Sequence, residues 1–428
     1  MNKQNIRQTI LGLLTLFSMY IYAVANTSSS SPNRVTAKKI ALLDVDLEEK
    51  RTLNYLNKIR KGAGLIPLNS RTELLSAARN HAKYLMQNHR IGHYEDENRS
   101  GYTGKYGSNR SVATGYQTAM IIENVSSNNI SYKESVDGLM AAIYHRFGFL
   151  DFHIDEIGIG VAQNLKNRAE TAFVYDMGSK KLEDLCINSK NKKVLKPLKD
   201  ICANPKSNIT KKSFLDAIYA HKYQNSKSVV YPYDGQEDVI PVFYEEIPDP
   251  LPNYGVSGFP ISMSFNEIGF KSVKMLSFKL FDGNGEEIKD TIFYNYKTDP
   301  NRKLKKYEFA LFPLRRLDWN SKYTVRASYE ADGVIKIKKW SFKTRNFDIP
   351  LYTVTENKNH YIIKKGKSAI FYFPPLSNRD TLGNLRFPSI FDISFVDKNT
   401  IRLKAKSMVD KRILFKFGKH QLYLDVQP

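Results

Sequence analysis

The sequence predicts an α+β protein in which a sandwich of helices and short strands is followed by β-rich modules. Two observations carry this prediction. Apolar residues recur every three or four positions in the first third of the chain, and they alternate with polar residues after about residue 231. Helices that come first, with short strands between or after them, are typical of an α+β sandwich. The 428 residues also exceed what one hydrophobic core usually organises, so several domains are expected.

The first domain, residues 42–179, is expected to contain three helices and two short strands. The helices are placed at 46–60, from 70 or 72 to 88, and at 133–145, and the strands at 157–162 and 172–175. In the first helix Leu53, Leu56 and Ile59 fall on one face, and two glycines beyond Arg60 end it. The second helix carries an alanine-rich stripe of the same spacing.

Residues 1–25 have the three parts of a secretory signal peptide. Lys3 and Arg7 precede an apolar run, and small residues up to Ala25 then offer a cleavage site. The run is shorter than the roughly 20 apolar residues that span a bilayer, so we expect cleavage after Ala25 and no transmembrane segment afterwards. Residues 26–41, rich in Ser, Asn and Thr, are expected to form a flexible leader. The chain should then act outside the cytoplasm, either secreted or in the periplasm.

A Lys-rich connector is expected at residues 180–230. It contains the only two cysteines of the chain, Cys186 and Cys202. In an exported protein such a pair is expected to form a disulfide, worth roughly 3 kcal/mol in the chain-entropy model. Metal binding by these thiols is disfavoured, because no CxxC motif or neighbouring histidine completes a ligand set.

Two β-rich modules are expected after the connector. In residues 231–346, turn sequences such as Asp282-Gly283-Asn284-Gly285 separate short alternating runs, as in an Ig-like β-sandwich. The Cys…Trp…Cys spacing of antibody domains is absent, so only the sandwich class is predicted. Residues 347–428 contain further alternating runs and are expected to form a small β-rich module.

A series of short motifs runs through the first domain in a fixed order. They are Asn57-x-x-Arg60-x-x-x-Gly64-Leu65-x-x-Leu68, Leu74-x-x-Ala77-Ala78-x-x-His81-Ala82, Gly92-His93-Tyr94-Glu95, Glu123-Asn124-Val125, His145-Arg146 and Glu156-Ile157-Gly158-Ile159-Gly160. Each is weak alone, but their order and spacing from Leu53 to Gly178 resemble the CAP superfamily (SCP/PR-1-like), in the cysteine-poor form common in bacterial secreted proteins. The resemblance implies an α/β/α sandwich. The turn sequences after Tyr231 are similar to an Ig-like module that follows such domains in some bacterial proteins.

The resemblance further implies an open cleft in which two histidines and one or two glutamates face each other. The matching cleft positions are His93, Glu95, Glu123, Asn124, His145 and Arg146. Among them His93, Glu123 and His145 could hold Zn²⁺ or another divalent cation, although no cofactor is required. The sequence departs from the family at Ile122, which replaces a glycine, and at Ala142, where many eukaryotic members have a second glutamate. The alternative is a polar network that stabilises the fold and catalyses nothing.

The leading interpretation is an exported binding or surface-interaction protein that uses the His/Glu cleft for a ligand or a divalent metal. From the resemblance, its partners would be a lipid, a sterol or an acidic cell-wall or surface polymer. Two alternatives stay open: a metal-dependent hydrolase of peptide or wall material, with His93, Glu123 and His145 as candidate catalytic residues, and a structural adhesin that acts through the β modules. Neither G-x-S-x-G nor H-E-x-x-H occurs, so no catalysis is assigned.

The net charge limits the chemical class of the expected binding partners but does not identify a particular one. The formal charge of +22 favours acidic partners, or serves only to keep an exported chain soluble. Nucleic acid is disfavoured, because the lysines are spread along the whole chain and no nucleic-acid-binding motif accompanies them. The sequence does not give the oligomeric state.

Overall fold

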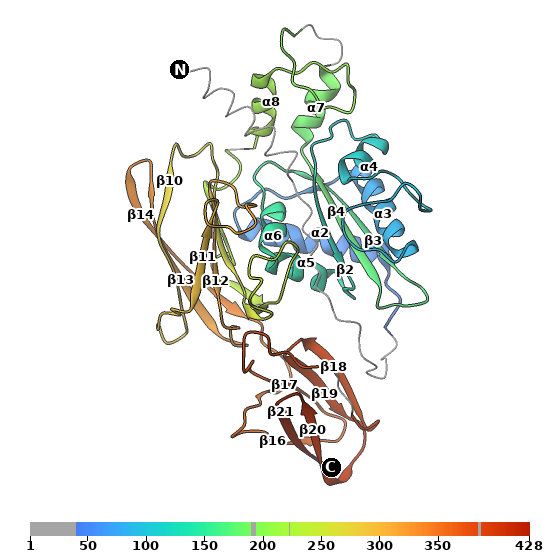
Figure 1. The fold of residues 1–428 in the computed structure, drawn as a ribbon, viewed down its shortest axis with the longest axis vertical. Coiled ribbons are helices and arrows are strands. Elements are labelled where there is room, and N and C mark those ends of the chain that lie inside the picture. The colour runs from blue at the N-terminus through green and yellow to red at the C-terminus, as the bar shows by residue number, and fades with distance from the viewer. Residues whose placement is uncertain (1–39, 190–193, 222, 384–386) are drawn as a thin grey trace.

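The computed structural model describes residues 40–189, 194–221, 223–383 and 387–428. In Figure 1 an N-terminal domain, a small helical connector, a β-sandwich and a C-terminal β module follow one another along the chain. The fold is therefore α+β with a β-rich C-terminal region, as predicted. The expected signal peptide and the expected leader up to residue 39 lie outside the described residues. Within the described ranges, no helix combines the length and the apolar character needed to cross a membrane.

The N-terminal domain is built on a four-stranded sheet of order β1-β3-β4-β2. The strands are β1 (Asn69–Ser70), β2 (Ile122–Ser127), β3 (Glu156–Gln163) and β4 (Thr171–Gly178). β4 pairs antiparallel with both β2 and β3, while β1 adds two residues in parallel. The strand β2 was not anticipated from the sequence, because its residues Glu123-Asn124-Val125-Ser126 carry a weak β pattern.

Helices cover both faces of this sheet (Figure 1). One face carries α2 (Val45–Gly62), α5 (Tyr132–Ala141) and α6 (Ile143–Phe149), and the other carries α3 (Thr72–Gln87) and α4 (Gly107–Ala113). The apolar side chains follow the same division: Leu56 and Val136 pack with Tyr175 on the first face, whereas Ala78 and Leu85 pack with Val174 on the second. The helix expected at 133–145 is split into α5 and α6, because Ala142 is extended at ψ 110°. The domain is thus an α/β/α sandwich.

Two glycines of β3 set the distance between the sheet and α3. A Cβ built on Gly158 would lie 1.9 Å from the carbonyl carbon of Leu74, and one on Gly160 would lie 2.2 Å from that of Ala78. No L side chain fits at either position. The Gly-Ile-Gly sequence is therefore required by the close approach of the helix backbone to the strand.

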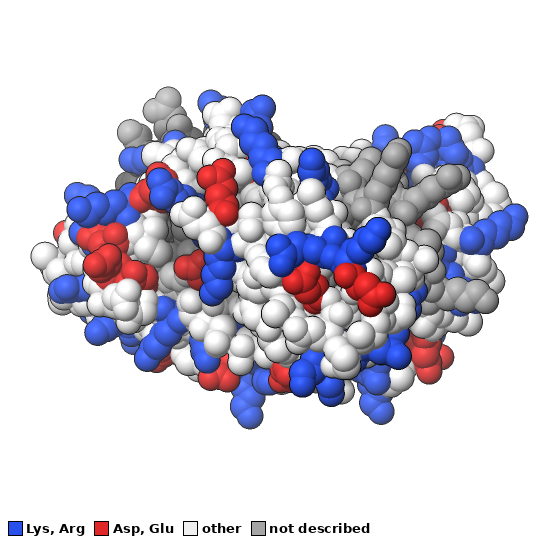
Figure 2. Space-filling model, turned by 90° about the horizontal axis from the view of Figure 1, so that it is seen from below, with Lys and Arg blue, Asp and Glu red and all other residues white. Residues whose placement is uncertain are grey.

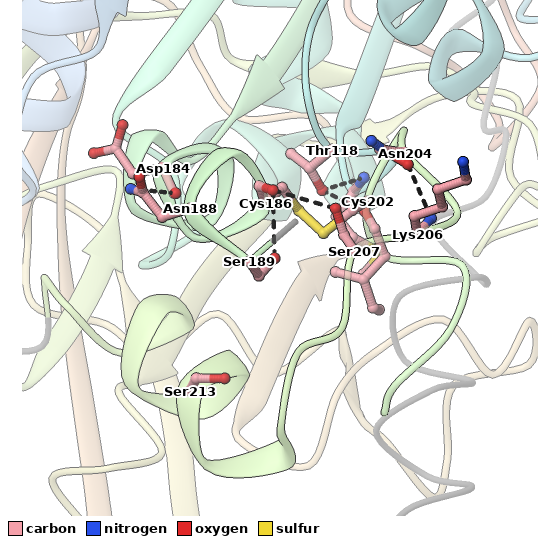
Figure 3. Close-up of a disulfide and its surroundings, with 12 residues drawn as sticks. Thr118, Asp184, Cys186, Asn188, Ser189, Cys202, Asn204, Lys206, Ser207 and Ser213 are labelled. Carbon is pink, nitrogen blue, oxygen red and sulfur yellow. Dashed lines mark hydrogen bonds between the residues drawn. A yellow bond between two sulfur atoms is a disulfide. The ribbon is translucent and has the colours of Figure 1, made fainter. Parts of the chain in front are cut away.

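The connector packs as a small helical unit at the end of the N-terminal domain (Figures 1 and 3). It contains α7 (Lys180–Asn188) and α8 (Lys211–Ile218), with Leu182 and Phe214 in a core of their own. The predicted disulfide between Cys186 and Cys202 is confirmed. The chain beside Cys202 is bound to the first domain, since Thr118 Oγ1 donates to the carbonyl of Ile201 at 2.7 Å.

The β-sandwich, residues 228–344, consists of two facing four-stranded sheets. One has the order β10-β13-β14-β6 and the other β11-β12-β9-β5, with the two-stranded β7-β8 beside them. The strands are β5 (Ser228–Tyr231), β6 (Gln236–Val239), β7 (Val242–Phe243), β8 (Ser257–Gly258), β9 (Ile261–Phe265), β10 (Val273–Phe281), β11 (Thr291–Asn295), β12 (Glu308–Pro313), β13 (Lys322–Ala331) and β14 (Val334–Thr344).

The β-sandwich and the N-terminal domain share one continuous hydrophobic core, which includes Ile59 and Ile143 on one side and Phe259 and Phe312 on the other. Charged pairs surround it: Arg345 binds Asp137 at 2.6 Å, and Lys305 binds Asp151 at 3.0 Å. A shared apolar core with ionic contacts at its rim indicates a fixed arrangement of the two domains.

The C-terminal module has its own core and two sheets, β15-β17-β19-β18 and β16-β21-β20. Its strands are β15 (Leu351–Thr353), β16 (His360–Lys364), β17 (Ser368–Tyr372), β18 (Phe391–Asp397), β19 (Thr400–Ala405), β20 (Val409–Phe417) and β21 (His420–Gln427). Arg316 of the β-sandwich joins the two units. Its guanidinium binds Asp397 at 2.6 Å and lies over the rings of Trp319 and Tyr372.

Candidate functional site

The residues expected to line one cleft lie on opposite faces of the sheet. Along a strand, neighbouring side chains point to opposite sides. In β2 the Glu123 side chain therefore faces α3 and α4, whereas Asn124 faces α6 and donates from Nδ2 to the carbonyl of His145 at 2.9 Å. His93 belongs to the first side and His145 to the second. The sandwich architecture thus separates the two histidines.

On the α3/α4 side, His93 and Arg110 share the carboxylate of Glu123. His93 Nδ1 contacts Glu123 Oε1 at 2.8 Å, and the Arg110 guanidinium binds the other oxygen. Arg110 also donates to the carbonyls of His93 and Gly104, at 3.1 and 3.0 Å. Burial alone would raise the pKa of Glu123, but the Arg110 charge and the His93 hydrogen bond outweigh it and hold the pKa well below its usual range.

Asp176 adds a second carboxyl group to this network. It is the register partner of Glu123 in the β2–β4 pair and is fully buried. Burial and the neighbouring Glu123 charge raise the pKa of Asp176 well above its usual range. Two adjacent carboxyl groups cannot both ionise without large repulsion, so Asp176 is the protonated member of the pair.

His81 and Glu95 extend the network toward the loop between α3 and α4. His81 Nδ1 contacts Glu95 Oε1 at 2.9 Å, and its Nε2 contacts the carbonyl of Gly92 at 2.9 Å. The backbone of Thr103 donates to the other Glu95 oxygen at 2.6 Å. Burial would raise the pKa of Glu95, yet the hydrogen bonds from His81 and Thr103 outweigh it and lower the pKa. Buried polar groups thus fix both ends of the loop from Gly92 to Gly104.

His145 is bound by a residue of the next domain. Its Nδ1 contacts Oε2 of Glu246 at 3.1 Å, and the side chains of both residues are buried. Arg146 is also buried in this interface: its guanidinium lies 5.0 Å from the ring centre of Tyr231 and 4.8 Å from that of Phe259. The expectation that His145 and Arg146 line an open cleft needs correction, because the β-sandwich covers this side of α6.

The metal-ligand set expected from the sequence is not assembled. Across residues 40–428, leaving out the undescribed positions, no group of three or more His, Cys, Asp or Glu side chains is placed to hold a metal ion. His93 and Glu123 contact each other and the Arg110 cation, while His145 contacts Glu246 on the far side of the sheet. These residues do not fit a three-ligand site, and metal binding stays a prediction.

The structure does bring together His93, Glu95 and Glu123, with three partners that the sequence analysis did not assign to the site. His81 appeared only as part of a motif in the second helix, and neither Arg110 nor Asp176 was assigned to the site. A signal for Asp176 exists, since this carboxylate stands between the apolar run Ala172-Phe173-Val174-Tyr175 and Met177. A charged residue at a buried position of a strand needs polar partners.

The exposed part of this region is aromatic and basic. Between buried His93 and Glu95, Tyr94 is 48% exposed and contacts Tyr106 edge-to-face with ring centres 5.5 Å apart. The ammonium group of Lys105 lies 5.3 Å from the centre of the Tyr106 ring. The buried network therefore presents a tyrosine pair and a cation at the surface of the loop.

Basic residues do not form a single patch on the face drawn in Figure 2, which views the molecule from below. Lys and Arg are spread over this face with Asp and Glu between them. This distribution is typical of a solvated surface. The net charge of +22 therefore does not by itself locate a binding site.

Comparison with known proteins identifies the first domain. The family model of the cysteine-rich secretory protein family, CAP, matches residues 53–177. Similar solved structures include an outer surface protein from Borrelia burgdorferi, with 19% identity over 32% of this chain and 95% of that chain and a TM-score of 0.28. Another is an extracellular protein containing a SCP domain from Bacillus anthracis str. Ames, with 16% identity over 31% and 40% of the two chains and a TM-score of 0.27.

A cysteine-rich secretory protein from Staphylococcus aureus has 16% identity over 32% of this chain and 41% of its own, with a TM-score of 0.21. None of the curated proteins compared with the chain matches it. The overall structural similarities are low, so the family match and the α/β/α architecture carry the identification. Residues 53–177 of this chain match the CAP family model, and the α/β/α sandwich that they form is the fold implied by the sequence resemblance.

Proposed function

We propose that this chain is an exported binding protein whose CAP domain presents a rigid surface loop to an acidic polymer of the cell envelope and does not hydrolyse it. The alternation at residues 93–95 carries the proposal. His93 and Glu95 point into the buried network, whereas Tyr94 between them points outward beside Tyr106 and Lys105. A buried polar network that holds the residues on both sides of Tyr94 limits the motion of the exposed rings, and a rigid binding surface loses little entropy when it binds.

The same network argues against general acid/base chemistry. A catalytic base has to accept a proton near the working pH. Glu123 has both oxygens engaged, by His93 and Arg110, and the balance of burial and the Arg110 charge keeps its pKa low. Asp176, the register partner of Glu123, is fully buried. Neither carboxyl group is placed to meet a substrate.

Export is part of the proposal. The first 25 residues have the pattern of a signal peptide, and the disulfide between Cys186 and Cys202 suits an oxidising compartment. A cationic side chain beside two aromatic rings offers an acidic glycan both an ionic partner and an apolar surface.

Sedimentation with insoluble peptidoglycan, whose peptides carry carboxylates, tests the binding function. The full chain should bind, and added salt should weaken binding because Lys105 acts through its charge. The Tyr94→Ala/Tyr106→Ala variant should lose most of the binding. Tyr296→Ala is the matched control, since Tyr296 is 42% exposed and has the ammonium of Lys297 5.7 Å from its ring centre. Equal loss in both variants, or no binding by the wild type, would refute the proposal.

The hydrolase alternative has its own test. Wild type and Glu123→Gln are incubated with peptidoglycan and with casein, and soluble products are measured. We expect no product above the buffer control from either protein. Product from the wild type that Glu123→Gln does not release would show catalysis.

The metal prediction is tested by calorimetric titration with Zn²⁺. The wild type is compared with His93→Ala/His145→Ala, and the prediction fails when both proteins bind Zn²⁺ alike.

A further inference from the structure

The β-sandwich has a second candidate surface on the outer face of its β10-β13-β14 sheet. In Figure 1 this sheet lies at the side of the molecule away from the N-terminal domain. β14 pairs with β13 over its whole length, but β6 reaches it only at Phe342 and Thr344. Among the described residues, no strand pairs with the other edge of β14 from Val334 to Lys339. At the end of the β13–β14 hairpin, which we call the ribbon, one edge of β14 is therefore open.

The outer face of the ribbon exposes aliphatic side chains. Trp340 and Phe342 of β14 are buried in the core, so the two-residue period directs Ile335, Ile337 and Lys339 to the opposite face. Ile335 is 66% exposed and Ile337 59%. Leu276, the extra residue of a bulge in β10, is exposed on the same sheet. Several large aliphatic side chains together on one exposed face indicate an interaction surface, whereas single ones do not.

Cations surround these aliphatic residues. Lys274 and Lys279 of β10, Arg326 of β13 and Lys339 of β14 are exposed on this sheet. Acidic groups are fewer: Glu330 is the register partner of Lys274, and Glu287 pairs with Lys279 at 2.8 Å. Glu330 is also the register partner of Ile335, and Ser328 that of Ile337, so the two isoleucines lie at the open edge of the sheet beside polar residues of β13. Lys336 and Lys338 lie on the opposite face of β14, the face of Trp340. The outer face therefore combines an aliphatic edge with an excess of cations.

The turn at the end of the hairpin is fixed. Asp332 and Gly333 both have positive φ, at 52° and 81°, as expected for the type I′ turn that joins two paired strands. The Asp332 carboxylate accepts from the backbone amides of Lys271 and Ser272, at 2.7 and 2.9 Å. Its charge is thus bound within the loops, and the ribbon is held in one orientation.

We propose that this face docks on a lipid bilayer that contains anionic head groups. The aliphatic side chains would enter the boundary between head groups and acyl chains, and the surrounding lysines would contact phosphates. Charge complementarity selects this occupant over a second copy of the chain. Pairing of two β14 edges would bring Lys336 and Lys338 close to the same lysines of the other copy, and edge lysines oppose such pairing. The surface is independent of the tyrosine pair in the CAP domain.

Vesicle sedimentation of the full chain tests the proposal. The probes are vesicles of phosphatidylcholine alone and vesicles of phosphatidylcholine with phosphatidylglycerol. We expect binding to the anionic vesicles only, weakened by salt. Ile335→Ser/Ile337→Ser should reduce the binding constant about tenfold or more, because the apolar contribution is lost. Lys274→Ser/Lys339→Ser should reduce it as well and should also flatten its dependence on salt.

Matched controls lie on β16 of the C-terminal module. Ile362, 49% exposed, and Lys364 are an aliphatic and a cationic residue on an exposed strand, so Ile362→Ser/Lys364→Ser should bind like the wild type. Thermal unfolding should be unchanged in all variants, since none of these side chains enters a core. Tyr94→Ala/Tyr106→Ala should also keep vesicle binding, which separates this surface from the proposed CAP-domain function.

Three results would overturn the proposal. They are absence of binding to anionic vesicles, equal loss in the control variant, and a dimer in sedimentation velocity that Ile335→Ser/Ile337→Ser abolishes. The last result would assign the face to a second copy of the chain.

Discussion

His145 of the CAP domain contacts Glu246 of the β-sandwich through Nδ1 and Oε2 at 3.1 Å, and both groups are buried at the centre of the domain interface. The backbone amide of Tyr144 also faces the Glu246 carboxyl group, with N···O distances of 3.4 and 3.3 Å. The residue that the family resemblance places in a ligand cleft thus joins two domains. A buried polar pair of this kind fixes the relative orientation of the two domains, because buried polar atoms have to meet hydrogen-bond partners.

Glu246 should make stability depend on pH. Burial raises its pKa well above the ordinary value, more than the backbone amides and Arg146 lower it. The folded state therefore keeps a proton that the unfolded state has released. Its contribution to stability is complete below the unfolded pKa of about 4.5 and is lost as the pH rises toward the folded pKa. In Glu246→Gln this group cannot titrate. Above pH 4.5 the wild type should lose free energy of unfolding relative to this variant.

Urea unfolding of both proteins at several pH values between 5 and about 9 measures this difference. Other titrating groups affect both proteins alike, so only the difference between the two curves is interpreted. Parallel curves would show that Glu246 does not change its protonation on folding.

The close approach of α3 to β3 should make Gly160 irreplaceable. In Gly160→Ala the new Cβ would overlap the backbone of Ala78 and Arg79, at 2.2 to 2.3 Å, so strand and helix would have to separate. Overpacking of this kind costs about 3 kcal/mol. Gly283→Ala is the control, because its Cβ would lie 3.5 Å from the nearest atom, the carbonyl oxygen of Lys322. Chemical denaturation should show a large loss for the first variant and little change for the second. Equal stabilities would contradict the packing argument.

Local patterns in the sequence predicted much of this architecture. The helical stripe through Leu56 and Ile59 lies on the buried face of α2, and the presence of two cysteines in a chain expected to be exported predicted the disulfide. The order of the CAP motifs predicted the sandwich. Each of these features depends on residues that are close in the sequence or on a whole series of motifs. A wrong interpretation of one residue therefore does not change the predicted fold.

The site was predicted less well, because its geometry depends on which face of β2 each residue occupies. Glu123 and Asn124 are neighbours in the sequence, but a strand directs their side chains to opposite faces of the sheet. His145 lies on the face of Asn124, whose side chain binds its carbonyl group. Since β2 was not predicted as a strand, this separation was not seen. The Glu246 partner lies 101 residues from His145, and no local pattern connects the two.

Arg110 should be essential for stability through Glu123. In Arg110→Ala the Glu123 carboxylate would remain buried with no cation beside it, which costs about 3–5 kcal/mol. Arg110→Ala/Glu123→Gln should be less destabilised than the sum of the two single variants, because the unpaired charge is also removed. Arg315, whose Nε lies 3.5 Å from Asp290 with both side chains exposed, is the control, and Arg315→Ala should cost about 1 kcal/mol or less. A double-mutant cycle by urea denaturation measures the coupling. Additive effects would show that Arg110 and Glu123 do not depend on each other.

The disulfide should hold the connector against the CAP domain. It closes a loop between residues separated by 16 positions, and such a cross-link contributes about 3 kcal/mol by restricting the unfolded chain. The core of the connector is small, with Leu182, Ile201 and Phe214 among its members, so it depends strongly on this contribution. In Cys186→Ser/Cys202→Ser, amide hydrogen exchange should accelerate in α7 and α8, while α3 should keep its protection. Reduction of the wild-type disulfide should give the same pattern. Uniform acceleration across the CAP domain would instead show that connector and sandwich unfold as one unit, and unchanged exchange would show that the disulfide adds no local stability.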